Sequence, residues 1–159
     1  MFGVVAVARY CARAFDLPVT IARMGSAYGE RGGLPAFHMD AVAAGHPVRV
    51  RWDPLPYTPI HDDDIALQLE PLLDVATVPA SLVNWAGDEA VSVQQWSAYF
   101  GELFGVGVEV IVEPVPGASL GSVGDPTKRI SLTGPCTVPW KDGFRRMASH
   151  FHPDRVAAV

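Results

Sequence analysis

The chain has 159 residues, 49% of them apolar, a size and composition that predict one domain with a real hydrophobic core. Twelve Lys and Arg residues against seventeen Asp and Glu residues give a formal net charge of −5, which argues against nucleic acid as a partner. No apolar stretch has the roughly 18 residues that a membrane span needs. Cys11 and Cys136 belong to no close-spaced pair, so we interpret them as reduced structural thiols in a cytoplasmic protein.

The first part of the chain predicts a helix, a strand and a glycine-rich loop in turn. Residues 2–15 predict a helix of the fold, because Arg9 and Arg13 interrupt the apolar run that a signal peptide would need. Residues 19–24, VTIARM, are short and β-branched, which is typical of a buried strand in a parallel sheet. The four glycines of residues 25–35 predict a loop in which the backbone can approach a ligand closely.

Helices and strands alternate over the rest of the chain, which predicts α/β architecture with right-handed crossovers. The further predicted elements are a helix over 34–45, a strand over 47–52, a helix beginning among residues 62–64, a strand over 81–87, a helix after a Ser92 cap, a half-exposed strand over 108–116 and a helix after Pro139. In the helix beginning at 62–64, helical spacing predicts a core-facing stripe at Ile65, Leu69, Leu72 and Leu73. We assign residues 1–152 to the domain and 153–159 to a flexible tail.

His61 and the three aspartates that follow it suit a metal site, an acid–base site or a helix start. Metal ligands must converge on one point, whereas adjacent side chains entering a helix point in different directions. Aspartates at a helix N-terminus accept backbone N–H groups and lie at the positive end of the helix dipole, for about 1 kcal/mol each. We therefore predict that Asp63 and Asp64 are structural caps, that His61 is packed, and that no metal binds; a metal-dependent hydrolase is the weakest hypothesis.

Three motifs, in order, resemble the NAD-dependent epimerase/dehydratase family, the extended short-chain dehydrogenase/reductases. PIHDDDIA, residues 59–66, is similar to the family's Phe-Ile-His-Val-Asp-Asp-Val-Ala stretch, with Asp62 in place of the valine. Residues 17–33 resemble its strand and Tyr-Gly-Pro turn, and residues 124–147 its Asp-x-Ser/Thr-Lys element and closing helix. The resemblance covers roughly residues 1–150 and implies the C-terminal part of a Rossmann-like doubly wound sheet with the small substrate-binding subdomain.

The family's chemistry depends on a Tyr-x-x-x-Lys pair, in which the Tyr exchanges a proton with the substrate and the Lys lowers the Tyr pKa. Counting back along the resemblance places that Lys at or next to Met1 and the Tyr before it, and Tyr10 is no substitute because Ala14 follows four residues later. The dinucleotide-binding turn would lie further upstream. The resemblance thus implies that this chain contains no catalytic residue. It also implies that the full-length family uses NAD or NADP, and that this chain alone does not bind that cofactor tightly.

The resemblance also implies site residues. Met24 and Gly25 would lie against the nicotinamide, Ser26 occupies the place of a substrate-binding Asn, and Leu34 and His38 begin a helix that lines the substrate pocket. A core position for Met24, a turn position for Ser26 and a solvated helix position for His38 are the structural alternatives.

Two departures from the family bear on the substrate. Tyr57 stands where nucleotide-sugar members carry an Arg, and residues 116–119 stand where they often carry a second Arg. Because these arginines would bind a pyrophosphate, we expect that the substrate is not a nucleotide sugar. We expect instead a small hydroxy or carbonyl compound, with Tyr57 stacking on it. The alternative function is a non-catalytic small-molecule-binding or regulatory module. Besides the substrate, the expected partner is a second copy bound through the first helix, or a missing N-terminal half. Unpartnered apolar edges predict a marginal or self-associating protein.

Overall fold

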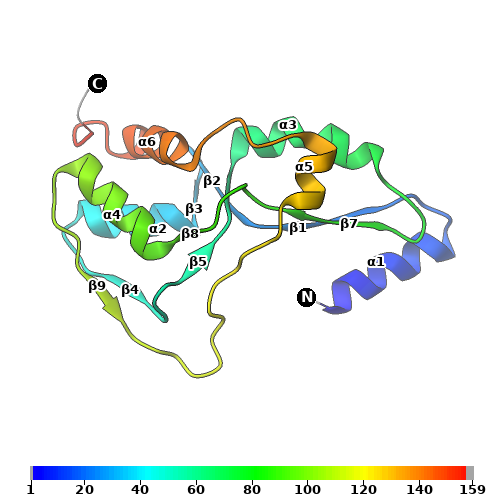
Figure 1. Ribbon diagram of the computed structural model, residues 1–159, viewed down its shortest axis with the longest axis horizontal. Helices are drawn as coiled ribbons and strands as arrows, with labels where there is room; N and C mark the ends of the chain where they lie inside the picture. Colours follow the sequence, from blue (N-terminus) through cyan, green and yellow to red (C-terminus); the bar gives the residue numbers. More distant parts are fainter. Residues whose placement is uncertain (1, 157–159) are drawn as a thin grey trace.

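A computed structural model describes residues 2–156, Phe2 by its backbone alone. The elements are α1 (Phe2–Ala14), β1 (Thr20–Met24), β2 (Ser26–Gly29), β3 (Gly32–Gly33), α2 (Leu34–Ala43), β4 (Val48–Val50), β5 (Pro56–Tyr57), β6 (Pro59–His61), α3 (Asp62–Asp74), β7 (Ser81–Trp85), β8 (Val91–Ser92), α4 (Val93–Phe104), β9 (Val110–Val112), α5 (Thr127–Thr133) and α6 (Trp140–Phe151). Strands and helices alternate, so the predicted α/β class is confirmed. Figure 1 shows α2, α4 and α6 gathered at one end, with the β1–β7 pair extending away from them.

The pair β1–β7 is parallel, with Thr20 opposite Ser81 and Met24 opposite Trp85. Helices α3 and α5 lie on one side of this pair and α1 on the other (Figure 1). The strand predicted over 19–24 is present, but the prediction that it is buried is wrong: residues 22–24 are exposed. The physical reason is that β1 has only β7 as a ladder neighbour among residues 2–156.

Helix α1 forms where the sequence predicts it but packs little against the rest of the chain. Val4 and Tyr10 are 74% and 70% exposed, whereas Ala12 is buried. An isolated helix of this length is marginal in water, and most helical stability in proteins comes from packing of an apolar face. This exposed apolar surface is therefore a candidate contact for another polypeptide.

Helix α3 presents a different face to the core from the one its leucines predict. The buried side chains are Asp64, Gln68 and Leu72, while Leu69 and Leu73 are 48% and 61% exposed. The two polar residues are buried because they have partners: Gln68 Oε1 accepts a hydrogen bond from Trp85 Nε1 at 3.0 Å, for example. The predicted stripe is confirmed at Leu72, which is buried, and at Ile65, which is half-buried. It is wrong at Leu69 and Leu73, because paired polar groups of the same helix occupy the core in their place.

Two groups of buried side chains stabilise the fold. The first core lies between α2, α4 and α6, and its largest members include Tyr28, Met39, Trp96, Phe100 and Phe144. The second core lies beneath α3 and α5 and consists of Ile60, Leu72, Val83 and Trp85. Phe144 is at the centre of the first core, with its ring centroid 4.5 Å from that of Tyr28 and 5.3 Å from that of Phe100.

The start of α4 follows the sequence prediction. Ser92 Oγ accepts a hydrogen bond from the Gln95 N–H at 3.1 Å, and Gln95 Oε1 accepts one from the Ser92 N–H at 2.7 Å. This reciprocal pair is a capping box, which satisfies two backbone donors at the helix start. The predicted Ser92 cap is confirmed, and α6 begins directly after Pro139 as predicted.

Residues 153–155 of the predicted tail are exposed, and Val156 is half-buried against the first core. Residues 157–159, the rest of the predicted tail, fall outside the described part, and the flexibility of the tail stays a prediction. Over residues 2–156, no helix is both long and apolar enough to cross a bilayer.

Replacing Phe144 with alanine tests the first core. The side chain is fully buried among aromatic rings, so the Phe144→Ala variant should lose about 3–5 kcal/mol of unfolding free energy, from lost burial and the cavity left behind. Urea denaturation measures this loss. Phe37→Ala, at an exposed position of α2, is the matched control and should change the free energy of unfolding by less than about 0.5 kcal/mol. Equal losses in the two variants would contradict this assignment of the core.

Candidate functional site

A cavity of about 200 Å³ lies at the carboxyl ends of β1 and β7, and we call it the strand-end cavity. Its lining includes Arg23, Met24, Gly25, Thr58, Asn84 and Gly124. In open parallel α/β sheets, ligands bind in the crevice outside the carboxyl ends of the strands. Met24 and Gly25, which the sequence predicts as cofactor-binding, therefore line a cavity in the expected place, and their contact with a cofactor stays a prediction.

Hydrogen bonds across the strand-end cavity hold its walls together. Arg23 Nε donates to Asn84 Oδ1 at 2.9 Å, and Asn84 Nδ2 donates to the Asp125 carbonyl at 3.1 Å. The Gly124 N–H donates to Thr58 Oγ1 at 3.2 Å. Asn84 and Thr58 are residues that sequence reasoning missed, although the amide of Asn84 stands out in the sequence between the apolar residues Val83 and Trp85.

Gly25 is required by the packing of this chain itself. Its N–H donates to the Trp85 carbonyl at 2.7 Å, and a Cβ atom at this position would lie 2.8 Å from the carbonyl oxygen of Thr58. No side chain fits without displacement of backbone. A strict preference for glycine here is explained without a ligand.

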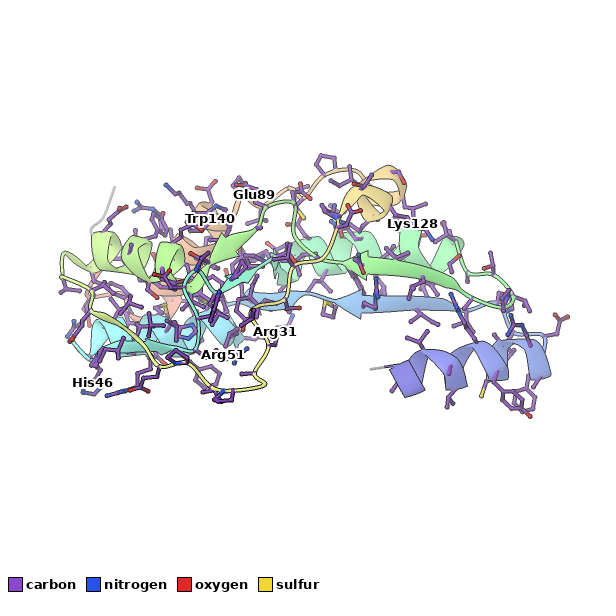
Figure 2. The ribbon with its side chains drawn as sticks, turned by 60° about the horizontal axis from the view of Figure 1, so that its bottom comes forward. Arg31, His46, Arg51, Glu89, Lys128 and Trp140 are labelled. Carbon is purple, nitrogen blue, oxygen red and sulfur yellow. The ribbon has the colours of Figure 1, made fainter. Side chains whose placement is uncertain are left out.

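The Asp-x-Thr-Lys element beside this cavity fixes α5 on the sheet. Asp125 Oδ1 accepts hydrogen bonds from the Thr127 N–H at 2.9 Å and from Thr127 Oγ1 at 2.6 Å. Lys128, which Figure 2 marks next to β7, donates from Nζ to the Leu82 carbonyl at 2.9 Å. The element that carries part of the family resemblance is therefore structural in this chain.

A second cavity, of about 260 Å³, lies between α2, β4 and β5, and we call it the arginine cavity. Leu34, His38 and Tyr57, which the sequence predicts as substrate-binding, all line it. Tyr57 and Thr58, adjacent in the chain, line the arginine cavity and the strand-end cavity respectively. The two cavities are therefore neighbours. Ser26, also predicted to bind substrate, is among the lining residues of neither cavity, and its role stays a prediction.

Trp96 forms an aromatic support behind the arginine cavity. Its ring centroid lies 5.6 Å from that of His38 and 5.7 Å from that of Tyr57. Trp96 Nε1 donates to His38 Nδ1 at 3.2 Å, so we infer that the neutral imidazole carries its proton on Nε2. Burial lowers the pKa of His38, which keeps the ring neutral. His38 is thus half-buried and hydrogen-bonded, which rules out the alternative of a solvated helix position.

Two arginines that sequence reasoning did not select lie in this cavity. Arg49 lies in β4 and Arg51 comes directly after its last residue, and the two are separated by one residue, Val50, so the alternation of an extended chain favours the same side for both. Arg49 is ion-paired with Glu113, from the end of β9. Arg51 Nη2 donates to the Tyr57 hydroxyl at 3.1 Å, and Arg51 Nε donates to the Ser119 carbonyl at 2.6 Å. Figure 2 marks Arg51 beside the long loop that follows β9.

The three consecutive aspartates serve three different partners. Asp62 Oδ2 lies 3.6 Å from Arg31 Nε, and Asp63 Oδ2 accepts a hydrogen bond from Arg146 Nη1 at 2.8 Å, which lowers the pKa of Asp63. Asp64, which is fully buried, accepts hydrogen bonds from the Thr137 N–H at 2.6 Å and the Val138 N–H at 3.2 Å. The carboxylates diverge, and no group of three or more His, Cys, Asp or Glu side chains in residues 2–156 could hold a metal ion.

The predicted capping role of Asp63 and Asp64 needs correction. The N-cap of α3 is His61, whose Nδ1 accepts the hydrogen bond of the Asp63 N–H at 3.1 Å. An imidazole nitrogen replaces the expected carboxylate because the Asp63 and Asp64 side chains have other partners. The three acids do lie in the first turn, where the helix dipole favours negative charge. His61 is buried, as predicted, with its ring 5.2 Å from that of Tyr28.

The glycine-rich segment after β1 is a hairpin and does not form an open loop. Its residues form β2 and β3, with Tyr28 opposite Gly33. A Cβ atom on Gly33, whose φ is +118°, would lie 2.3 Å from the Ala27 carbonyl oxygen. A Cβ atom on Gly29 would lie 2.8 Å from Asp62 Oδ2. Gly29 and Gly33 thus allow the chain to approach itself, and the approach of this segment to a ligand stays a prediction.

Solved structures that match this fold include UDP-sugar 4-epimerases and dTDP-glucose 4,6-dehydratases. UDP-glucose 4-epimerase of Thermotoga maritima matches with a TM-score of 0.81 at 18% identity, over 96% of this chain and 52% of its own. UDP-glucuronic acid 4-epimerase of Bacillus cereus matches with a TM-score of 0.80 at 17% identity, over 93% and 49%. dTDP-glucose 4,6-dehydratase of Streptomyces venezuelae matches with a TM-score of 0.80 at 19% identity, over 96% and 49%.

The chain has the fold of one half of these enzymes. It spans about half the length of the solved structures that it matches, and the resemblance to the C-terminal half of the epimerase/dehydratase family is confirmed at the level of the fold. No family model and no curated protein sequence matches the chain.

A third cavity, of about 130 Å³, includes the Cys136 side chain in its lining, together with His61, Asp64 and Asp88. Burial raises the pKa of the Cys136 thiol to about 11. Because the thiolate is the nucleophile, this thiol is poorly suited to covalent chemistry at neutral pH. The Asp88 carboxylate is ion-paired with the buried Arg129 and also accepts a hydrogen bond from the Cys136 N–H at 2.9 Å. These contacts make the third cavity a structural feature of the second core.

The Asp64→Asn variant tests the buried carboxylate. The Asn amide has one oxygen, so it can accept only part of the hydrogen bonds from Thr137 and Val138, and its NH₂ group would face a backbone N–H donor. The free energy of unfolding should therefore fall by about 2–3 kcal/mol. Chemical denaturation measures the loss. Asp62→Asn, in the same turn but paired only loosely with Arg31, should cost less than about 1 kcal/mol. A loss from Asp64→Asn no larger than that from Asp62→Asn would refute the anchoring role.

Thiol modification tests the environment of Cys136. At pH 8, a thiol of pKa about 11 is ionised roughly a hundredfold less than an ordinary cysteine, so carbamidomethylation by iodoacetamide should be slower by about that factor. Mass spectrometry of peptides from the native protein gives the rate, and a urea-unfolded sample gives the reference. A native rate close to the unfolded one would show that Cys136 is a reactive thiol.

Proposed function

We propose that the chain is the substrate-binding half of an NAD(P)-dependent epimerase, dehydratase or reductase whose substrate is a small hydroxy or carbonyl compound. The observation that carries the proposal is the strand-end cavity at the carboxyl ends of β1 and β7, in a fold shared with enzymes whose structures contain NAD. The adjoining arginine cavity, where three of the predicted substrate-binding residues meet, supports it as the substrate site.

The strand-end cavity suits the nicotinamide end of a dinucleotide. Met24, 47% exposed at the end of β1, offers an apolar surface for a flat ring, and the 122–124 segment forms another part of the lining. A bound dinucleotide would supply hydride transfer. The pyrophosphate has no comparable cradle in residues 2–156, because the glycine-rich segment is a hairpin folded against its own backbone. The described residues thus suit the nicotinamide end of the cofactor and not its pyrophosphate.

The sizes of the cavities favour a small substrate. At about 260 Å³ the arginine cavity lies below the usual range of pockets for drug-sized ligands, which begins near 300 Å³. Its aromatic support and its aliphatic lining, Leu34 and Leu55 among them, suit a compact and partly apolar molecule.

Activity in this proposal requires a dinucleotide-binding half. The 159-residue sequence contains no Tyr-x-x-x-Lys pair. The outer edge of β1, which pairs only with β7 in residues 2–156, and the exposed apolar side chains of α1 give such a half a place to bind. The chain alone should neither oxidise nor reduce a substrate.

A non-catalytic binding module is the second candidate function. The polar groups of the arginine cavity are held by contacts within this chain, with Arg51 fixed by Tyr57 and Ser119, and they need no cofactor to be in place. A module of this kind would bind the same class of small molecule without turnover.

Fragments of NAD distinguish the two functions. In NMR titrations of the full chain, nicotinamide mononucleotide should shift the Met24 methyl signal and the Asn84 side-chain amide signals, whereas AMP should not. The reason is that the chain supplies the wall for the nicotinamide end alone.

Two glycine variants provide the matched controls. Gly124→Val should abolish the shifts, because a Cβ atom there lies 3.3 Å from the Cβ atoms of Ala86 and Asn84 and a larger side chain fills the cavity. Gly107→Val, at a position with open space around it, should leave them unchanged. If neither fragment causes a shift in the native chain, or if both do so equally, the cofactor role fails and the binding-module function is favoured.

A further inference from the structure

The arginine cavity contains one positive charge that the protein does not balance. Arg49 is ion-paired with Glu113, whose carboxylate comes from the neighbouring strand end. Arg51, by contrast, forms no ion pair with any carboxylate in residues 2–156. Its two hydrogen bonds go to neutral oxygens, the Ser119 carbonyl and the Tyr57 hydroxyl. The charges of Arg49 and Glu113 cancel, so the positive charge of Arg51 remains as the net charge of these three side chains.

The contacts of Arg51 orient the guanidinium without using up its donors. Nε and Nη2 are bound to Ser119 and Tyr57, and Nη1 donates to no group in residues 2–156. A guanidinium has additional N–H groups in a planar fork, which matches the two oxygens of a carboxylate. Because the side chain is half-buried and already held at two points, less conformational entropy is lost when an anion binds.

The side chains next to Arg51 offer donors as well. The Tyr57 hydroxyl accepts from Arg51, so its own proton is available for a ligand. His38 uses Nδ1 as the acceptor for Trp96, which leaves the Nε2–H group as a donor. Glu113, the one carboxylate in the lining, is already occupied by Arg49. The unoccupied polar groups of the cavity are therefore hydrogen-bond donors, and they are complementary to a ligand group that accepts hydrogen bonds.

From this arrangement we propose that the arginine cavity binds a carboxylate group of the substrate, through Arg51, Tyr57 and His38. The inference rests on the proposed function and narrows its substrate class to small hydroxy or keto compounds that carry one carboxylate. A single unbalanced charge matches a carboxylate better than a phosphate, which carries about −1.5 to −2 at neutral pH. The volume of about 260 Å³ and the aliphatic lining also suit a small organic acid.

Three probes with the same phenyl ring test the head group. Benzoate, benzamide and phenyl phosphate are titrated into the ¹⁵N-labelled full chain at matched ionic strength, and the Arg51 Nε–H and Trp96 indole signals are followed. We expect saturable shifts with benzoate, no such shifts with the uncharged benzamide, and weaker binding of phenyl phosphate than of benzoate. Benzamide binding as tightly as benzoate, phenyl phosphate binding more tightly, or no shift with any probe would each overturn the proposal.

Variants in the cavity test the assigned residues. Arg51→Gln should weaken benzoate binding by about tenfold or more, because a charge-assisted hydrogen bond is lost. Arg31→Gln, the same change at a side chain that is 90% exposed and outside the cavity, should leave it unchanged. Glu113→Gln releases Arg49 from its ion pair and should strengthen binding by about two- to fivefold, the range of an exposed charge interaction.

The outcomes separate this inference from the proposed function. Benzoate binding needs no dinucleotide, so it can succeed while nicotinamide mononucleotide fails to bind, in which case the carboxylate site stands and the cofactor role does not. If Arg51→Gln lowers the stability of the fold, the comparison of benzoate with benzamide in the native chain still decides the question. An unchanged benzoate affinity in a folded Arg51→Gln variant would overturn the proposal.

Discussion

The Asp64 carboxylate lies on α3, above the second core, yet accepts its hydrogen bonds from Thr137 and Val138, immediately before α6 of the first core. A buried carboxylate is unfavourable unless it is well paired, so these bonds fix the approach of the chain to α6. Through α6 they also position Phe144 against Trp96, which supports His38 and Tyr57. One buried acid thus connects the sheet that carries the strand-end cavity with the helices whose aromatic side chains support the arginine cavity.

The two parts of the fold differ in how completely they are covered. The first core is enclosed on several sides by helices, whereas within residues 2–156 β1 pairs only with β7 and α1 exposes apolar side chains. Burial rather than propensity supplies most helical stability. The helices of the first core should therefore resist local unfolding more strongly than the sparsely packed α1. The cavity that we assign to the substrate lies in the well-packed part, and the strand-end cavity lies where the uncovered sheet begins.

Sequence patterns predicted the elements well, because capping chemistry and periodicity are local. The Ser92 cap, the start of α6 after Pro139 and the strand β7 all follow from neighbouring residues. The buried face of α3 could not be predicted in the same way, since Gln68 and Asp64 are buried by partners far along the chain, such as Trp85 and Thr137. The exposure of β1 likewise depends on which strands lie beside it.

The site was predicted in part, and for a similar reason. Family resemblance selected Leu34, His38 and Tyr57, which meet in one cavity. It could not locate Arg51, because the guanidinium reaches Tyr57 from the bend that follows β4. The contact between Arg51 and Ser119 has one more effect. Ser119 precedes the 122–124 segment that walls the strand-end cavity. The Ser122 N–H also donates to the Pro56 carbonyl at 2.9 Å, so one loop is fastened both to β5 and to Arg51. The same stretch of backbone thus shapes both cavities, and a change of its length would disturb the two together.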